Sequence, residues 1–141
     1  MPPATSPRTA VVTGGASGIG AAIVRRLDQD GYRVATLDIS PAEASPSYTV
    51  DVTDRAQIDT ALTDIRSRFG PVTILVNAAG AEGSARFLDI SFAEWQHVID
   101  VTLNGVFHTT QAVLPDMLDA GWGRIVNISS SSTHSGTPMK T

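Results

Sequence analysis

The chain has 141 residues, of which 42% are apolar and only 17% are charged, a composition that suits one globular domain. Its formal net charge is −4. Proteins that bind nucleic acid or anionic membranes need a basic surface, and the sequence has no basic stripe, so both classes of function are disfavoured. The low charge content predicts that most strands are buried on both faces.

The chain has no cysteine, which excludes disulfides, thiolate catalysis and cysteine-ligated zinc. Its three histidines, His97, His108 and His134, lack the spacing of metal ligands, so we expect no metal site. Residues 1–9 lack the apolar core of a signal peptide, and no apolar run reaches the roughly 18 residues of a membrane span. We therefore expect a cytoplasmic protein.

Short apolar runs alternate along the chain with longer segments of helical periodicity. The runs predicted to be strands are residues 10–12, 33–37, 48–50, 72–76 and 124–128. The segments predicted to be helices are residues 18–30, 54–69 and 92–120. This alternation predicts an α/β fold, a doubly wound parallel sheet with flanking helices and right-handed crossovers.

Capping and breaking residues mark the helix boundaries. Thr53 is expected to be the N-cap of the second helix. Ser91 and Glu94 have the spacing of a capping box at the start of the third. Pro115 lies inside that long helix and is expected to kink it or to mark a break.

A glycine-rich segment, Thr-Gly-Gly-Ala-Ser-Gly-Ile-Gly, joins the first predicted strand to the first predicted helix. Glycines at such a junction let the backbone turn tightly and approach a pyrophosphate, and the helix N-terminus offers free N–H groups. The sequence therefore predicts a dinucleotide-binding loop, with an ordinary strand-to-helix turn as the alternative. The loop residues assigned to the cofactor are Thr13, Gly14, Ser17, Gly18, Ile19 and Gly20.

Asp38 ends the second predicted strand, 18 residues after Gly20. A carboxylate at this position can accept hydrogen bonds from both ribose hydroxyls of an adenosine, and it repels a 2′-phosphate. Residues 39–47 contain no lysine or arginine to receive such a phosphate. NAD is therefore preferred to NADP as the predicted cofactor, and the alternative role of Asp38 is to cap a loop.

The spacing Thr-Gly-x-x-x-Gly-x-Gly resembles the short-chain dehydrogenase/reductase family, and further segments resemble that family in the same order. These segments are Asp51-Val52, Asn77-Ala78-Ala79-Gly80, Leu103-x-Gly105-x-Phe107 and residues 123–130. The resemblance runs from about Thr9 to the last residue and implies a Rossmann-type fold. It also implies that residues 51–52 contact adenine and that residues 77–80 steady the central sheet beside an NAD(P) cofactor.

In that family a serine, a tyrosine and a lysine interconvert a ketone and a secondary alcohol. The resemblance implies that Ser130 is the serine, which binds the substrate oxygen. The tyrosine transfers the proton, and the lysine lowers the pKa of the tyrosine. Thr102 stands where the family has an active-site asparagine, and whether its hydroxyl substitutes is left open. Asn104 falls on a variable position of the signature and is expected to point elsewhere.

The Tyr-x-x-x-Lys motif of the family is expected about a dozen residues after Ser130, just past the last residue. Tyr32 and Tyr48 belong to or flank other strands, and Lys140 has no tyrosine four residues before it. The chain as given is therefore predicted to be inactive. It is interpreted as one Rossmann domain, residues 1–141, that lacks its C-terminal part.

The missing part would also carry packing surfaces. Without it, the fifth strand is expected to be an unprotected sheet edge. An apolar helix face with Val106, Val113 and Leu114 is expected to lose part of its cover.

Three hypotheses for function follow. The first is the N-terminal portion of an NAD-dependent oxidoreductase that acts on a small-molecule alcohol or ketone. The second is a non-catalytic dinucleotide-binding module, and the third is one half of a split enzyme. The retained Ser130 segment favours the first, and the complete protein is expected to be a homo-oligomer, a dimer or a tetramer. The identity of the substrate is left open.

Overall fold

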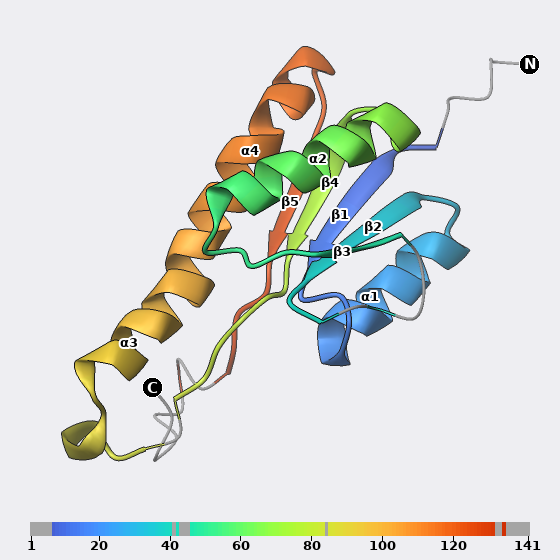
Figure 1. The fold of residues 1–141 in the computed structure, drawn as a ribbon. Helices are drawn as coiled ribbons and strands as arrows, with labels where there is room; N and C mark the ends of the chain where they lie inside the picture. The colour runs from blue at the N-terminus through green and yellow to red at the C-terminus, as the bar shows by residue number, and fades with distance from the viewer. Residues whose placement is uncertain (1–6, 41, 43–45, 84, 132–133, 135–141) are drawn as a thin grey trace, which may run out of the picture.

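The computed structural model describes residues 7–40, 42, 46–83, 85–131 and 134, which form a parallel sheet with strand order β3-β2-β1-β4-β5 (Figure 1). The strands are β1 (Thr9–Thr13), β2 (Arg33–Asp38), β3 (Ser47–Thr49), β4 (Val72–Asn77) and β5 (Arg124–Asn127). The α-helices are α1 (Gly18–Gln29), α2 (Arg55–Phe69), α3 (Phe92–Ile99) and α4 (Gly105–Asp119). The expected doubly wound α/β fold is confirmed.

The sheet lies between two helical layers, with α1 on one face and α2 and α4 on the other (Figure 1). Successive side chains of a strand point to opposite faces, so Val11 packs toward α2 and α4 while Val12 packs toward α1. Every residue of β1 and β4 is buried, as the low charge content predicted. No helix in the described part of the chain is long and apolar enough to cross a membrane.

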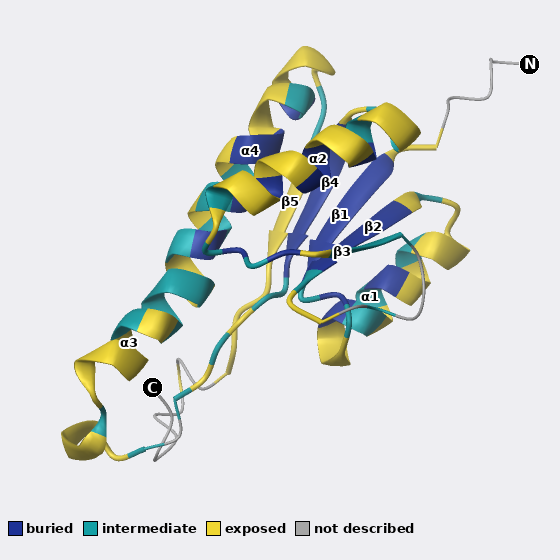
Figure 2. Cartoon of the chain, viewed as in Figure 1, coloured by how far each residue is buried: buried dark blue, intermediate teal, exposed yellow. Residues whose placement is uncertain are grey.

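The edge strand β5 differs from the central strands. All four of its residues are exposed, and its described neighbour is β4 (Figure 2). The expectation of an uncovered sheet edge is therefore met within the described residues. Val113, by contrast, is fully buried against the sheet, so its assignment to an uncovered face was wrong. Leu114, the next residue on α4, is 39% exposed.

The register of the sheet brings four strand ends together. Thr13 pairs with Leu37 and with Asn77, and Asn77 pairs with Asn127. Because the strands are parallel, the loops after β1, β2, β4 and β5 leave the sheet at one edge. The winding reverses between β1 and β4, and ligands of open α/β sheets bind in the crevice at such a point.

Helix α2 begins one residue later than predicted. Its N-cap is Asp54, whose Oδ1 accepts hydrogen bonds from the N–H groups of Ala56 and Gln57 at 2.9 and 3.2 Å. Thr53 instead donates its N–H and its hydroxyl to Asp51 Oδ1, at 2.9 and 2.7 Å. Both residue types are good N-caps, and the competing carboxylate of Asp51 decides between them.

The long helical region is divided at a different place from the one predicted. Pro115 lies inside α4, and the helix continues through it to Asp119. The division is a π-helical segment, Asp100–Asn104, between α3 and α4. Gly105 there donates its N–H to the carbonyl of Asp100, five residues back. Pro115 costs the helix one N–H donor without ending it.

The predicted capping box at the start of α3 is confirmed. Ser91 Oγ accepts from the N–H of Glu94 at 3.2 Å, and Glu94 Oε2 accepts from the N–H and the hydroxyl of Ser91 at 2.9 and 2.6 Å. These donors, the hydroxyl of Ser91 first, lower the pKa of the Glu94 carboxyl. The ionised form of Glu94 is therefore the one that stabilises the folded chain.

Glu94→Gln is expected to destabilise the chain above about pH 4.3, the unfolded pKa of glutamate, where the charged acceptor is fully present. The difference in stability between Glu94→Gln and wild type should shrink as the pH falls through the lower pKa of Glu94 in the folded state. The glutamate of wild type and the glutamine of the variant are then both neutral. Thermal melts of the two proteins between pH 7 and pH 3 measure this. Asp28→Asn on the exposed surface of α1 is the control, and an equal pH dependence in both variants would contradict the assignment.

Candidate cofactor and active site

The loop after β1 turns in contact with the loop after β4. Gly14 has φ of 65° and donates its N–H to the carbonyl of Leu37 at 2.8 Å. A Cβ on Gly14 would lie 2.8 Å from both Cα and N of Ala79. A Cβ on Gly20 would overlap the carbonyl of Gly14. Both positions therefore need glycine because backbone segments approach closely there.

The outer side of the same loop is open. Gly18 has φ of +53°, and no atom lies within 4 Å of a Cβ placed on it. Ser17 is the N-cap of α1, but its side chain makes no capping hydrogen bond, and the first turn of α1 has no acidic residue. This backbone fits a pyrophosphate, since the helix N-terminus keeps donors and positive potential for an anion. Ile19, one of the loop residues assigned to the cofactor, is 63% exposed at the start of α1.

Asp38 joins the glycine loop to the end of β2. Its Oδ2 accepts a hydrogen bond from the N–H of Ala16 at 3.0 Å, and its Oδ1 accepts from the N–H of Ser40 at 2.9 Å. These bonds hold the carboxylate beside the N-terminus of α1. Each oxygen can accept a further hydrogen bond, so a loop-holding role and contact with two ribose hydroxyls are compatible.

The pair Asp51-Val52 lies where the chain passes from β3 to α2. Asp51 receives both donors of Thr53, and its own N–H donates to Gln57 Oε1 at 2.9 Å. Val52 is 6% exposed, and a Cβ on Gly105 would lie 2.7 Å from its Cγ2. Val52 thus packs against the start of α4, which leaves little of its side chain for a ligand.

The segment after β4 is held by a buried hydroxyl of β1. Thr13 is 2% exposed, and its Oγ1 accepts hydrogen bonds from the N–H groups of Ala78 and Ala79, both at 3.1 Å. These bonds bring residues 78–80 to the glycine loop at the crevice between β1 and β4. The structure therefore places two of the segments assigned to the cofactor side by side.

Asn77 connects β4 to Asn127, within the family-like segment 123–130, and to Thr109, which the sequence did not single out. Its Nδ2 donates to Asn127 Oδ1 at 2.9 Å, and its Oδ1 accepts from the hydroxyl of Thr109 at 2.7 Å. Asn77 and Thr109 are 4% and 1% exposed. A polar residue at position 109, four residues after Gly105 and four before Val113 on the buried helix face, was the signal available in the sequence.

Thr102 and Ser130, the two candidate catalytic residues, lie on different elements. Thr102 is in the π-helical segment, where its Oγ1 accepts a hydrogen bond from the N–H of Ala81 at 3.4 Å. Asn104 donates its amide to Asp100 Oδ1 at 2.8 Å along its own helix. Ser130 is exposed in the segment that follows β5. Lys140 lies outside the described residues.

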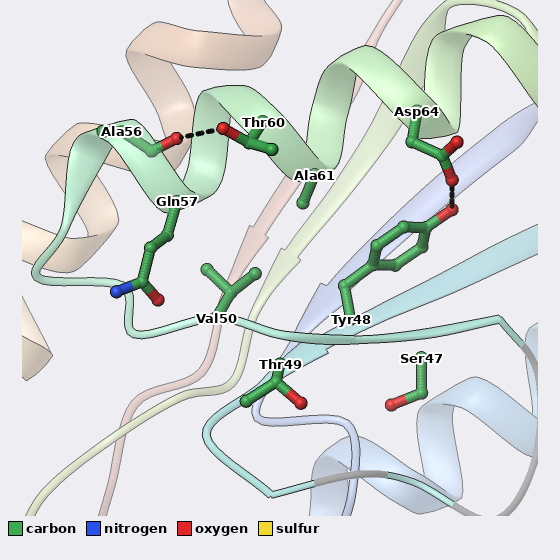
Figure 3. A pocket seen from close by; sticks show the side chains of 9 residues that line it. All are labelled: Ser47, Tyr48, Thr49, Val50, Ala56, Gln57, Thr60, Ala61 and Asp64. Atoms are coloured by element: carbon green, nitrogen blue, oxygen red, sulfur yellow. Dashed lines mark hydrogen bonds between the residues drawn. The ribbon is translucent and has the colours of Figure 1, made fainter.

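A cavity of about 540 Å³ lies beside the outermost strand β3, between β3 and α2 (Figure 3). Tyr48 spans it and donates its hydroxyl to Asp64 Oδ2 at 2.6 Å. Burial, and then the bond to Asp64, raise the pKa of Tyr48. The hydroxyl of Tyr48 thus joins β3 to α2.

Known proteins that are similar to this chain include dehydrogenases and reductases. The chain is 37% identical to a 2-dehydro-3-deoxy-L-rhamnonate dehydrogenase (NAD(+)) of Sphingomonas sp. strain SKA58, over 93% of this chain and 57% of that protein. It is 37% identical to an acetoacetyl-CoA reductase of Allochromatium vinosum, over 92% of this chain and 58% of that protein.

Among solved structures, the aldohexose dehydrogenase of Thermoplasma acidophilum superposes with a TM-score of 0.84 at 32% identity, covering 88% of this chain and 49% of that one. The chain thus spans about half the length of the relatives that it matches. The family model described as short chain dehydrogenase matches residues 8–141. The chain belongs to the short-chain dehydrogenase family.

Proposed function

We propose that this chain is the NAD-binding portion of an oxidoreductase that interconverts a ketone and a secondary alcohol. The observation that carries the proposal is the position of Asp38, whose carboxylate is bonded to Ala16 N beside the open N-terminus of α1. A carboxylate held there favours ribose hydroxyls and repels a 2′-phosphate. The family membership and the NAD(+)-dependent relative support the same cofactor class.

Each part of the dinucleotide has a candidate partner in this arrangement. The backbone of residues 14–20, with the open side at Gly18, would hold the pyrophosphate. Asp38 would accept both hydroxyls of the adenosine ribose, and Asp51, with the main chain of Val52, would border the adenine. Residues 77–80, held by Thr13, would lie beside the nicotinamide half. When bound, the cofactor supplies the hydride chemistry.

The chain also carries part of the proposed catalytic group. Ser130 would donate a hydrogen bond to the substrate oxygen. Thr102 would take the place of the family asparagine and order the segment at Ala81. The tyrosine and lysine of the family are not among these 141 residues, so we expect this chain to bind NADH without catalysing turnover.

The names of the relatives suggest the class of substrate to test. They include a dehydrogenase of a deoxy sugar acid, reductases of acetoacetyl-CoA and a D-beta-hydroxybutyrate dehydrogenase of Rhizobium meliloti. We propose a small oxo or hydroxy acid, free or as a thioester, as the first class to test. The split enzyme and the non-catalytic module are the alternative outcomes.

We further propose that the complete protein is a homo-oligomer. Apolar side chains spaced along one side of the π-helical segment and α4 are exposed: Leu103, Phe107, Leu114 and Leu118. Several exposed large apolar side chains on one side of a helix are typical of an interaction face. A protein–protein contact there would bury the area that this chain leaves in water.

Asp38→Ala is expected to weaken NADH binding about tenfold, equivalent to the loss of about 1.4 kcal/mol, and to narrow the preference for NADH over NADPH. Fluorescence titration of both cofactors measures this. Asp38→Asn keeps one acceptor oxygen but removes the charge, so it should lose discrimination more than affinity. Asp28→Ala removes an exposed carboxylate of α1 and should change neither constant.

The outcomes separate the hypotheses. If wild type fails to bind NADH, the assignment of the glycine loop is wrong. If binding occurs and Asp38→Ala keeps the full preference, Asp38 is not in the cofactor site. A version extended past Thr141 by the corresponding segment of a relative, with its Tyr-x-x-x-Lys, tests catalysis. NADH binding without reduction of any ketone in a broad panel would overturn the enzyme proposal in favour of a binding module.

A further inference from the structure

We propose that Thr109 is a positioning residue of the active site, which orients the amide of Asn77 and through it the end of β5 that leads to Ser130. The proposal rests on the proposed function for its consequence in cofactor binding. Its structural basis is a hydrogen-bonded chain that runs from α4 through β4 to β5. Thr109 lies in α4, Asn77 at the end of β4 and Asn127 at the end of β5.

The series of hydrogen bonds starts from the hydroxyl of Thr109. Three oxygens lie within hydrogen-bonding distance of its Oγ1: Asn77 Oδ1 at 2.7 Å, the Gly105 carbonyl at 2.9 Å and the Val106 carbonyl at 3.2 Å. A threonine hydroxyl has one proton, so it can fully satisfy one of them. The bond to Asn77 is the shortest and joins two elements, whereas the others are local to the helix.

The oriented amide of Asn77 in turn bonds to the end of β5. With its Oδ1 bonded to Thr109, its Nδ2 faces β5 and donates to Asn127 Oδ1 at 2.9 Å. The main-chain carbonyl of Asn77 also accepts the N–H of Ile128 at 3.0 Å. The last strand residue and the next are therefore both bonded to Asn77, two residues before Ser130.

Without a hydrogen-bond donor at position 109, the orientation of the Asn77 side-chain amide is no longer fixed. A buried amide oxygen that lacks its donor is costly, so nothing then prevents the amide of Asn77 from turning over. It would then direct Oδ1 at Asn127 Oδ1, so that two acceptors face each other. Either the carboxyl end of β5 would separate from β4, or the amide of Asn127 would have to rotate. Both changes alter the position of the segment that contains Ser130.

The same strand end also carries the cofactor segment. Residues 78–79 follow Asn77 directly and are held by Thr13 from the other side. Thr13 and Thr109 thus fix the end of β4 from two elements, one through its main chain and one through its side chain. Loss of the second contact is expected to disturb both the cofactor loop and the serine segment.

The test compares Thr109→Val, which has a similar shape and no donor, with Thr109→Ser, which restores the hydroxyl. Thr110→Val, on the adjacent and partly exposed residue, is the matched control. Hydrogen exchange of the Ile128 amide should be about tenfold faster in Thr109→Val, and the side-chain amide signals of Asn77 and Asn127 should shift. Thr109→Ser and Thr110→Val should keep the wild-type values.

NADH binding gives the functional readout. Its dissociation constant should rise about tenfold in Thr109→Val and stay within about twofold in Thr109→Ser. The Ile128 exchange and the amide signals do not depend on NADH, so they still test the network if wild type fails to bind it. Unchanged exchange and unchanged amide signals in Thr109→Val would overturn the proposal.

A second variant tests the orientation if Thr109→Val does not fold. Asn127→Asp keeps the acceptor that Asn77 Nδ2 needs and removes the donor of position 127, which is exposed. With Thr109 setting the proposed orientation, Asn127→Asp should keep slow exchange at Ile128, while Asn127→Leu should lose it. Fast exchange in Asn127→Asp would show the reverse orientation and overturn the proposal.

Discussion

Replacing Gly14 by alanine is expected to lower the free energy of unfolding by about 2 to 5 kcal/mol and to abolish NADH binding. Two effects add at this position. An alanine at φ of 65° is strained, and its Cβ would lie 2.8 Å from the backbone of Ala79. The loop after β4 would have to move away from the glycine loop, which opens the crevice between them. Urea unfolding followed by circular dichroism measures the stability.

Gly31→Ala isolates the contact from the strain. Gly31 follows α1 with φ of 85°, and no atom lies within 4 Å of a Cβ placed on it. Its substitution should therefore cost only the backbone strain, about 1 to 2 kcal/mol, and leave NADH binding intact. Equal losses for the two variants would mean that the close approach at Gly14 has no energetic weight.

Asp116→Ala is expected to cost about 2 kcal/mol, because it leaves the Nε–H of a partly buried arginine and a backbone N–H without their acceptor. Asp116 accepts from Arg66 Nε at 2.9 Å and from the N–H of Val72 at 2.8 Å. It therefore ties α4 to α2 and to the first residue of β4. The side chain of Asp116 is 14% exposed and that of Arg66 is 34% exposed, so solvent screens part of the interaction.

Asp59→Ala is the matched control. Asp59 pairs with Arg55 at the same distance, 2.9 Å, but its side chain is 53% exposed on the surface of α2. An exposed pair of this spacing contributes about 0.3 to 0.5 kcal/mol. Urea unfolding of both variants gives the comparison. Equal small losses would show that Asp116 is a surface charge without a role in holding the layers together.

Much of the fold was predictable because local patterns specify it. Apolar runs and helical periodicity located the strands and helices, and the Ser91–Glu94 box predicted the start of α3 correctly. The misplaced features involve competition between neighbours. Thr53 and Asp54 are both capable caps, and the carboxylate of Asp51 selects between them by binding Thr53. Pro115 is a helix breaker in isolation, yet α4 continues through it.

The candidate site was predictable where a motif has its own backbone geometry. The glycine loop and Asp38 belong to this class, since a tight turn and a strand-end carboxylate can be recognised from spacing. Thr109 and Asn127 do not belong to it. Each bonds to Asn77, at least 32 positions away in the chain, and although a polar residue on a buried helix face marks Thr109, no local pattern identifies its partner.

The order of the elements, the glycine loop at the first strand-to-helix junction and the position of Asp38 after the second strand can all be predicted from the sequence alone. These properties depend on side-chain size, periodicity and backbone freedom over short stretches. The tertiary structure decided which of these segments meet. Parallel pairing sets Thr13, Asn77 and Asn127 side by side. It also brings Ala79 so close to Gly14 that a single methyl group would not fit. Such proximity arises from packing of distant segments, which the residues on either side of a position do not encode.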